Sequence, residues 1–408
     1  MTPLNKLNIS IELEGDHYQA GELVLASNKI YFRYNSQFLN TGLNLSPLKL
    51  AFNNEIQSAT SEPFEGLFGL FNDSLPDSWG RLLMDRELRS RNIDLTQITP
   101  LDRLAYVGSG GMGALVYTPD FKRKISKMGS IDLDKTEDEI KNVLKGDPSD
   151  ILEELYALGG SSGGTRPKIF VAFDPGNKEL IYGPDTPGNN YENWIIKFPA
   201  TVDSPEIAKI EYAYHIMAIA AGIEMSECRL FEGNSGNLFF GTLRFDRDAE
   251  KRYHVHTASG LIHDNFKSSN MDYGHLMDCA FRLEKHVKAY EKVFRLAAFN
   301  VFAHNRDDHS KNFSFLMNRK GQWKFAPAYD LTFSYSAFGF HSTMIAGESK
   351  EPGKDDLLRL AKHFGLRDPE RIIEEVRSAI SKWETIALDL DISKRTISEI
   401  ASKINCKL

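Results

Sequence analysis

The sequence predicts an α+β fold in which a β-rich N-terminal lobe is followed by an all-helical C-terminal lobe. Short apolar runs with strand-like alternation, separated by Asn, Gly and Ser turns, are concentrated before about residue 250. Amphipathic helical patterns dominate from about Asp272 onward. A doubly wound parallel sheet would alternate strands and helices along the whole chain, so this segregation argues against it.

Two sheet-containing parts are expected before residue 250. The first, residues 1–125, contains the alternating run at residues 30–34 and a helix whose start is marked by Pro76. The polar, charged residues 122–150 are interpreted as a connector or a surface helix, and a boundary is expected there.

The second part, residues 150–250, combines strands with one helix. Strands are expected at residues 169–173, 194–198 and 238–245, and a helix at 205–221 that Ser204-Pro205 opens and Gly222 closes. The third part, residues 251–408, holds the later helices, including one that follows Asp368-Pro369.

Composition and charge exclude several classes of protein. The 408 residues, 41% of them hydrophobic, allow two or three domains with full-size cores and exclude a disordered chain. With 49 Lys and Arg against 56 Asp and Glu, the formal net charge is -7, which argues against a protein that coats nucleic acid by itself.

Cysteine spacing and the N-terminus predict the compartment. Cys228, Cys279 and Cys406 lie too far apart for a disulfide framework or a zinc cluster, which is typical of a reducing compartment. The first residues are charged instead of forming an apolar leader, and no run of about 18 apolar residues occurs. We therefore expect a cytoplasmic protein with no membrane contact.

The densest polar cluster, residues 304–312, lies between an apolar helix and the apolar run 313–317. Phosphoryl transfer to a hydroxyl needs a carboxylate near the acceptor proton and oxygen ligands for Mg²⁺. Asp307 and Asn312 have the spacing of the Asp and Asn in the protein-kinase pattern H-R-D-x-x-x-x-N, and Asp330 follows where kinases carry D-F-G. Taken singly, each is more often a capping or turn residue, but their order favours a kinase.

A glycine-rich stretch at residues 158–168 has three interpretations. Glycines around two serines let backbone N–H groups approach an anion closely, as a phosphate-binding loop requires. The pattern G-x-S-x-G, with Ser161 or Ser162 as its serine, is typical of the nucleophile of α/β-hydrolases, but that nucleophile follows a strand and precedes a helix, the reverse of the order expected here. The third interpretation is a flexible structural turn.

A lysine lies within an otherwise apolar strand, and a glutamate lies on the following helix. Burying Lys197 is costly unless its ammonium meets an anion, and a kinase lysine meets the nucleotide phosphates and a helix glutamate, here Glu211. The alternative is an edge-strand lysine and a surface glutamate, both facing solvent.

Together these motifs resemble the HipA family of bacterial serine/threonine kinases, the toxins of toxin-antitoxin pairs. The resemblance covers most of the chain, and its most specific part is the D-x-H-x-K-N-F block with the following Y-D. The motifs that carry it are Leu75-Pro76-Asp77-Ser78-Trp79-Gly80-Arg81, the loop 159–168, Trp194-Ile195-Ile196-Lys197-Phe198-Pro199, Phe245-Asp246-Arg247, Asp307-Asp308-His309-Ser310-Lys311-Asn312-Phe313 and Pro327-Ala328-Tyr329-Asp330.

The resemblance implies a two-lobed protein-kinase-like fold that uses ATP and Mg²⁺ to phosphorylate a protein serine or threonine. It implies Asp307 as the catalytic base, Asn312 and Asp330 as metal ligands, and autophosphorylation of Ser161 or its neighbour Ser162. It further implies a nucleotide site made of Gly163, Gly164, Thr165, Arg166, Lys168, Lys197, Leu243, Phe245, His309, Lys311, Asn312 and Asp330. Leu243 stands where relatives often carry Glu, although adenine is usually held there by backbone groups.

Partners also follow from the resemblance. In the best-known relatives the target is an aminoacyl-tRNA synthetase, so a translation-related target and growth arrest are implied. A HipB-like DNA-binding antitoxin is the implied partner, with DNA contacted only through it. Two other functions remain open: a catalytically idle partner of such an antitoxin that acts in transcriptional regulation, and a metal-dependent hydrolase that uses His304, Asp307, Asp308 and His309.

Overall fold

The computed structural model of the protein describes residues 3–122, 129–149, 151–160, 164–182, 190–336 and 339–404. These residues form two compact units: residues 1–204, 231–256 and 316–321 group in the first, and residues 205–230, 257–315 and 322–408 in the second. The parts expected at 1–125 and 150–250 lie mainly in the first unit, whereas residues 205–230 group with the helical unit.

A five-stranded antiparallel sheet forms the N-terminal part of the first unit. Residues 7, 9, 11 and 13 of β1 are fully buried because alternate side chains of a strand point to the same face. The strand order is β4-β3-β2-β1-β5, with β1 Lys6–Leu13, β2 Asp16–Ala26, β3 Lys29–Tyr34, β4 Gln57–Ser58 and β5 Leu115–Thr118.

Short and medium helices accompany this sheet. They are α1 Ser36–Leu39, α2 Gly69–Asn72, α3 Ser78–Ser90, the 3-10 helix η1 Leu95–Gln97 and α4 Pro100–Val107. Helix α3 begins two residues after Pro76, so the helix expected there is present with a slightly later start. Its buried side includes Trp79, Leu83 and Leu88, which have helical spacing.

The second sheet of this unit has six strands in the order β10-β11-β9-β7-β8-β6. The expected strands are present as β7 Lys168–Asp174, β9 Glu192–Lys197 and β11 Leu238–Leu243, with β6 Gly129–Ser130, β8 Glu179–Tyr182 and β10 Cys228–Glu232 beside them. Helices α5 Leu133–Lys145 and α6 Leu152–Gly159 precede β7. Strands β7 and β9 are antiparallel, and their register places Lys168 directly opposite Lys197.

A buried ion cluster follows β11. Asp246 is fully buried, and Arg244 binds it with Nε at 2.9 Å and Nη2 at 2.8 Å. Arg247 contacts the same carboxylate, and the amide of Gly113 donates to it at 2.7 Å. Burial alone would raise the pKa of Asp246, but the charges of Arg244 and Arg247 outweigh it and hold that pKa well below its usual range. The Phe-Asp-Arg motif therefore ties residue 113 of the N-terminal part to the end of the second sheet.

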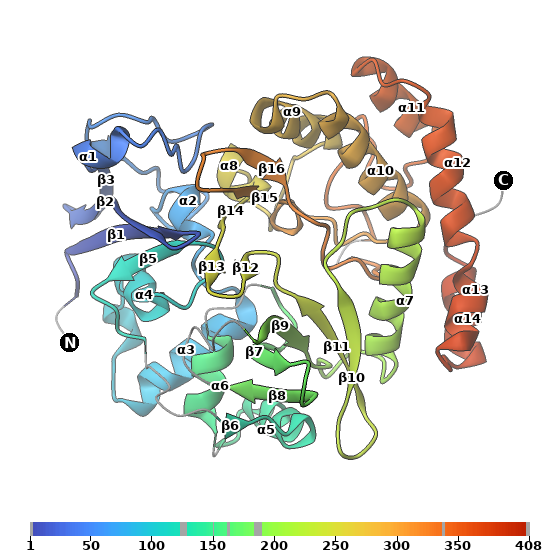
Figure 1. Cartoon of the computed structure of the whole chain (residues 1–408), viewed down its shortest axis with the longest axis horizontal. Coiled ribbons are helices and arrows are strands. Elements are labelled where there is room, and N and C mark those ends of the chain that lie inside the picture. Colours follow the sequence, from blue (N-terminus) through green and yellow to red (C-terminus); the bar gives the residue numbers. More distant parts are fainter. Residues whose placement is uncertain are drawn as a thin grey trace. The chain divides into compact units, whose positions relative to one another are not determined.

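The second unit is mainly helical. Helices α10 Lys288–Phe302 and α12 Pro369–Ile380 pack side by side, and α7 Ile207–Ala220 also contacts α12 (Figure 1). The core comes from apolar residues at helical spacing, for example residues 372, 373, 376 and 380. The other helices are α8 Ala258–Ile262, α9 Tyr273–Glu284, the 3-10 helix η2 Ser310–Asn312, α11 Lys354–His363, α13 Trp383–Asp389 and α14 Lys394–Ala401.

Some details of the second unit differ from expectation. It contains strand β16 Trp323–Phe325 and the start of β15 Ser314–Met317, so it is not purely helical. Helix α7 begins at Ile207 instead of Pro205, and no side chain caps it. In the first unit, two further short strands, β12 Arg247–Asp248 and β13 Lys251–Arg252, pair with each other, and β14 His254–Thr257 follows, with its last residue grouped in the second unit.

Two further features concern helix hydropathy and the cysteines. In the described parts of the chain, no helix combines the length and the apolar character needed to span a membrane. Cys228 and Cys279 are free and buried, and Cys406 lies outside the described residues.

Acid is expected to destabilise the first unit through His254. This side chain is fully buried, and burial lowers its pKa to about 4, while Nε2 lies 2.9 Å from the carbonyl of Leu45. The unfolded chain binds the proton more readily, so stability falls as the pH drops below about 6.5. When the pH is lowered from 7.5 to 5, the free energy of unfolding should fall by about 2 kcal/mol less in His254→Gln than in the wild type. Denaturant unfolding at both pH values measures this difference. Equal losses would contradict this role.

Candidate functional site

The polar loop 304–312 follows α10 in the second unit. Helix α10 ends at Phe302, and His304 adopts a left-handed conformation with a φ of 56°, which turns the chain out of the helix. The loop closes in η2 and continues into β15, whose four residues are all buried. The loop is therefore held between two buried elements, as the sequence predicts.

Asp307 is the exposed carboxylate of this loop, with 54% of its side chain accessible. The Nδ2 atom of Asn312 donates to the backbone carbonyl of Asp307 at 2.8 Å, so the two residues are fixed relative to each other. Nε2 of His309 lies 3.8 Å from Oδ1 of Asp307. Three of the residues predicted for catalysis and nucleotide binding are thus brought together.

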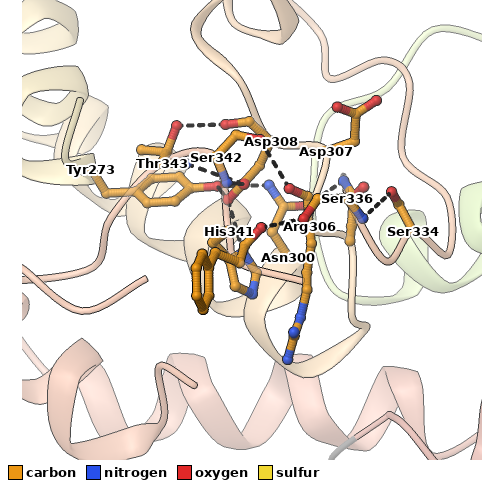
Figure 2. A network of polar contacts seen from close by, with 12 residues as sticks. Tyr273, Asn300, Arg306, Asp307, Asp308, Ser334, Ser336, His341, Ser342 and Thr343 are labelled. Carbon is orange, nitrogen blue, oxygen red and sulfur yellow. Dashed lines mark hydrogen bonds and ion pairs between the residues drawn. The ribbon is translucent and has the colours of Figure 1, made fainter. Parts of the chain in front are cut away.

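Asp308, next to this carboxylate, points the opposite way into the protein. Its carboxylate accepts hydrogen bonds from the Tyr273 hydroxyl at 2.9 Å and from the backbone amide of Ser342 at 2.8 Å, and it lies 3.0 Å from Nδ1 of His341 (Figure 2). Asn300 on α10 in turn donates to the Tyr273 hydroxyl at 2.7 Å. This buried network anchors the loop directly beside Asp307.

The segment after Asp330 is joined to the same loop by backbone contacts. Asn305 and Ser334 form a parallel bridge, and the amide of Ser334 donates to the carbonyl of His304 at 3.1 Å. Burial, with the charge of Arg306, lowers the pKa of His304 to about 4, so this ring is neutral at pH 7. Its Nδ1 lies 3.2 Å from the carbonyl of Ser334, and this imidazole is a structural part of the loop.

Asp330 has a backbone conformation that is unusual for its residue type. Its φ is 54°, in the left-handed region, which a non-glycine residue adopts at some cost in free energy. The hydroxyl of its neighbour Tyr329 donates to the carbonyl of Lys311 at 2.6 Å. The segment that carries Asp330 therefore lies against the segment that carries Lys311 and Asn312.

Lys311 and His309 share an aromatic neighbour. Nζ of Lys311 lies 4.6 Å from the ring centre of Phe266, and the ring of His309 lies 5.5 Å from the same ring. The hydroxyl of Ser310 donates to Asp264, so the loop is also tied to the residues that follow α8.

Removing the Asp308 carboxylate is expected to break the buried hydrogen-bond network that holds the loop 304–312. In Asp308→Ala, the Tyr273 hydroxyl and the amide of Ser342 lose a buried acceptor, which should lower the free energy of unfolding by about 3 kcal/mol or more. Asp308→Asn keeps an acceptor oxygen and should lose less. Urea denaturation of both variants measures this difference, and a double-mutant cycle with Tyr273→Phe should show coupling. Purely additive losses would contradict the network.

The glycine-rich loop and two lysines form a second group, in the first unit. Gly164 has a φ of +86° and donates its amide to Oδ2 of Asp77 at 3.1 Å. Lys168 and Lys197 are both buried, and because they are directly opposite each other their side chains leave the sheet on the same face. Nζ of Lys197 lies 5.4 Å from the ring centre of Phe240. Two buried lysines that leave the same face of a sheet suit a polyphosphate.

The other predicted nucleotide residues of this unit have varied environments. Arg166 makes a bidentate ion pair with Asp203, at 2.9 and 3.1 Å, which gives it a structural partner. Leu243 pairs with Trp194 at the end of β11, and Phe245 lies in the turn that follows. Thr165 is exposed. Ser161, Ser162 and Gly163 lie outside the described residues.

The donor set of the second unit fits magnesium. Mg²⁺ is usually bound through one or two carboxylates together with substrate phosphates and water. Because Asn312 uses Nδ2 on the carbonyl of Asp307, its Oδ1 is the atom left for a cation, and Asp330 supplies a carboxylate.

The metal-hydrolase alternative does not fit this geometry. It requires His304, Asp307, Asp308 and His309 to converge on one ion, but Asp308 is buried among Tyr273 and His341 and points away from Asp307 (Figure 2). Within the part of the chain that the structure describes, no group of three His, Cys, Asp or Glu side chains is arranged to hold a metal.

Two contacts were missed by the sequence reasoning. The Asp308 network depends on Tyr273 and His341, which are far from the loop in sequence and carry no motif of their own. Asp77 and Trp79 contact the glycine-rich loop, and their motif was noted without a role.

Sequence-family comparisons match most of the chain. A model described as the HipA-like C-terminal domain matches residues 160–383, which is more than half of the chain, and one described as the HipA N-terminal domain matches residues 13–118. A curated protein of Haemophilus influenzae described as "Putative kinase" is 29% identical over 204 residues, covering 46% of this chain and 57% of that protein. The match therefore spans little more than half of that relative's length.

Comparison with solved structures identifies the fold. The HipA toxin of Shewanella oneidensis, solved with HipB and its operator DNA, matches with a TM-score of 0.70 and 16% identity over 98% of this chain and 95% of that chain. The Helicobacter pylori kinase CtkA matches with a TM-score of 0.35 and 16% identity over 60% of this chain and 90% of that chain. The predicted two-lobed α+β fold is thus confirmed by the HipA structure.

Proposed function

Because the chain belongs to the HipA family, we propose that it is an ATP- and Mg²⁺-dependent serine/threonine protein kinase that acts as a growth-arresting toxin. The observation that carries this proposal is the loop of the second unit, where an exposed Asp307 is fixed to Asn312 and the segment of Asp330 packs against it. These contacts support the proposal because phosphoryl transfer to a hydroxyl uses a carboxylate near the acceptor proton and oxygen ligands for Mg²⁺.

In this mechanism each residue has a separate task. Asp307 accepts the proton of the acceptor hydroxyl, which its exposure allows. Asn312 Oδ1 and the Asp330 carboxylate would hold Mg²⁺, which when bound neutralises charge on the phosphates. Lys168 and Lys197 bind phosphate oxygens of the nucleotide.

Substrate, partner and control are proposed by family likeness. We propose a translation-related target such as an aminoacyl-tRNA synthetase, a HipB-like DNA-binding antitoxin, and autophosphorylation of Ser161 or Ser162. The solved HipA structure contains HipB and operator DNA, which supports the antitoxin as the partner class. With a net charge of -7, contact with DNA through a partner suits this chain better than direct contact.

Nucleotide binding tests the proposal directly. Titration calorimetry should show ATP binding that depends on Mg²⁺ in the wild type and is weakened about tenfold or more in Lys197→Met, because a phosphate loses a buried ammonium. Asp330→Asn should reduce the dependence on Mg²⁺. Absence of any ATP binding in the wild type would instead favour the catalytically idle partner of an antitoxin.

Phosphoproteomics identifies the target. Brief expression of the wild type beside Asp307→Asn should give phosphosites that appear only with the wild type. Phosphate on this chain that is found only outside residues 159–165 would contradict the proposed autophosphorylation site.

A further inference from the structure

The N-cap residue of α3 and the second residue of this helix contact the two ends of the turn from Gly164 to Lys168. Oδ2 of Asp77 accepts the amide of Gly164 at 3.1 Å, and Nε1 of Trp79 donates to the carbonyl of Lys168 at 3.0 Å. All four residues belong to the first unit. One rigid element from the N-terminal part thus holds a turn that lies almost ninety positions later in the sequence.

The side chain of Asp77 does not cap its own helix but contacts Gly164. It occupies the N-cap position of α3, where an Asp side chain normally accepts an amide of its own helix. Here it makes no such hydrogen bond and accepts the amide of Gly164 instead. Natural proteins break local rules of this kind chiefly at functional or strained positions.

The turn is packed so closely that its position is narrowly defined. A Cβ atom added at Gly164 would lie 2.5 Å from Nζ of Lys168, so this ammonium passes directly over the glycine. A Cβ atom at Gly159 would lie 2.6 Å from the carbonyl oxygen of Lys168 and 3.1 Å from Nε1 of Trp79. The backbone contact requires glycine at position 159, and the φ of +86° favours glycine at position 164.

The position of Lys168 matters because of its neighbour across the sheet. Lys168 and Lys197 are directly opposite each other and both are buried, so their side chains leave the sheet on the same face. Contacts that fix the backbone of the turn therefore also fix the point from which the Lys168 side chain leaves the sheet. The two contacts from α3 do this at residues 164 and 168.

We propose that Asp77 and Trp79 form a latch that holds the glycine-rich turn in its nucleotide-binding position, so that Asp77 is a positioning residue for phosphoryl transfer. The proposal deepens the proposed kinase function and rests on it. When the latch is open, the Gly164 amide and the Lys168 ammonium lose their fixed geometry, and ATP binds more weakly. The N-terminal part of the chain thereby controls the nucleotide site without contributing a catalytic group.

Hydrogen exchange on the full-length, nucleotide-free protein tests the latch independently of kinase activity. In Asp77→Ala, amide exchange at residues 164–166 should accelerate by about tenfold or more, because a hydrogen bond to a charged acceptor is lost. Exchange in β1 and β2 should not change. Asp77→Asn retains an acceptor oxygen and should restore most of the protection.

Calorimetry with ATP and Mg²⁺ supplies the second readout. Asp77→Ala should raise the Kd for ATP about tenfold, and Asp77→Asn should recover most of that loss. The matched control is Arg81→Ala on the same helix, whose exposed pairing with Glu65 at 3.4 Å lies outside the latch, and it should leave both readouts at wild-type values.

The outcomes separate the latch from the kinase proposal. Unchanged exchange in Asp77→Ala, or exchange that rises equally throughout the first unit, would overturn the latch. Tighter ATP binding in Asp77→Ala would also overturn it, because Asp77 would then compete with a phosphate for the Gly164 amide. A wild type that binds no ATP while the exchange result holds would contradict the kinase function and retain the contact that defines the latch.

Discussion

Asp307→Asn is expected to reduce phosphoryl transfer by about a thousandfold or more while leaving the protein folded. The amide that replaces the carboxylate cannot accept the proton of the acceptor hydroxyl. The side chain is 54% exposed, and Asn312 is bound to the backbone carbonyl of residue 307, which the substitution keeps. The thermal unfolding midpoint should therefore change little.

The loss of activity is measured as transfer of radiolabelled phosphate from ATP to the chain itself. The variant and the wild type are assayed separately at the same concentration. The matched control is Asp389→Asn, a substitution of the same chemistry at an exposed position at the end of α13 in the same unit. It should retain wild-type transfer. Robust activity in Asp307→Asn would remove Asp307 as the base, whereas unaltered ATP binding together with lost transfer would support it.

The polar loop 304–312 could be predicted from the sequence because its signal is local. The spacing of Asp307 and Asn312 is contained in one polar stretch between apolar segments, and the structure fixes the two residues through one short hydrogen bond. The strands around Lys168 and Lys197 were likewise predictable from short apolar runs. Their direct pairing across the sheet was not, because register depends on the whole sheet.

Contacts between distant segments could not be predicted. Asp308 looks identical to Asp307 in the sequence, yet one is buried under Tyr273 and His341 and the other is exposed. Nothing local distinguishes them, because the partners that bury Asp308 lie about thirty-five positions away on either side. The start of α7 also differs from the prediction: the helix begins at Ile207, and Asp203, four residues before it, is engaged by Arg166 and by the amide of Ala200.

Asp246→Ala should cause the largest loss of stability in the first unit. The carboxylate is fully buried between Arg244 and Arg247, and its removal leaves two guanidinium groups without their shared counter-charge. Breaking a buried pair in this way costs about 3–5 kcal/mol. The amide of Gly113 also loses its acceptor, so the contact between the N-terminal part and the end of the second sheet weakens. Denaturant unfolding monitored by circular dichroism measures the difference.

The control for this prediction lies two residues away. Asp248 is 62% exposed and pairs with Lys251 at 3.8 Å, so Asp248→Ala should change the free energy of unfolding by less than about 0.5 kcal/mol. Comparable losses in the two variants would show that burial of Asp246 does not determine the effect.

The pH dependence of the Asp246 effect distinguishes it from that of His254. The two guanidinium charges hold the folded-state pKa of Asp246 well below the value of the unfolded chain, so its contribution is complete above about pH 4 and is lost only in stronger acid. The gap between wild type and Asp246→Ala should therefore be constant from pH 8 to pH 5. His254, whose pKa burial lowers to about 4, weakens the wild type within that same interval. A gap that widens as the pH falls from 8 to 5 would mean that the Asp246 carboxylate takes up a proton in the folded protein because its pKa is raised, and the two arginines would then not be its dominant partners.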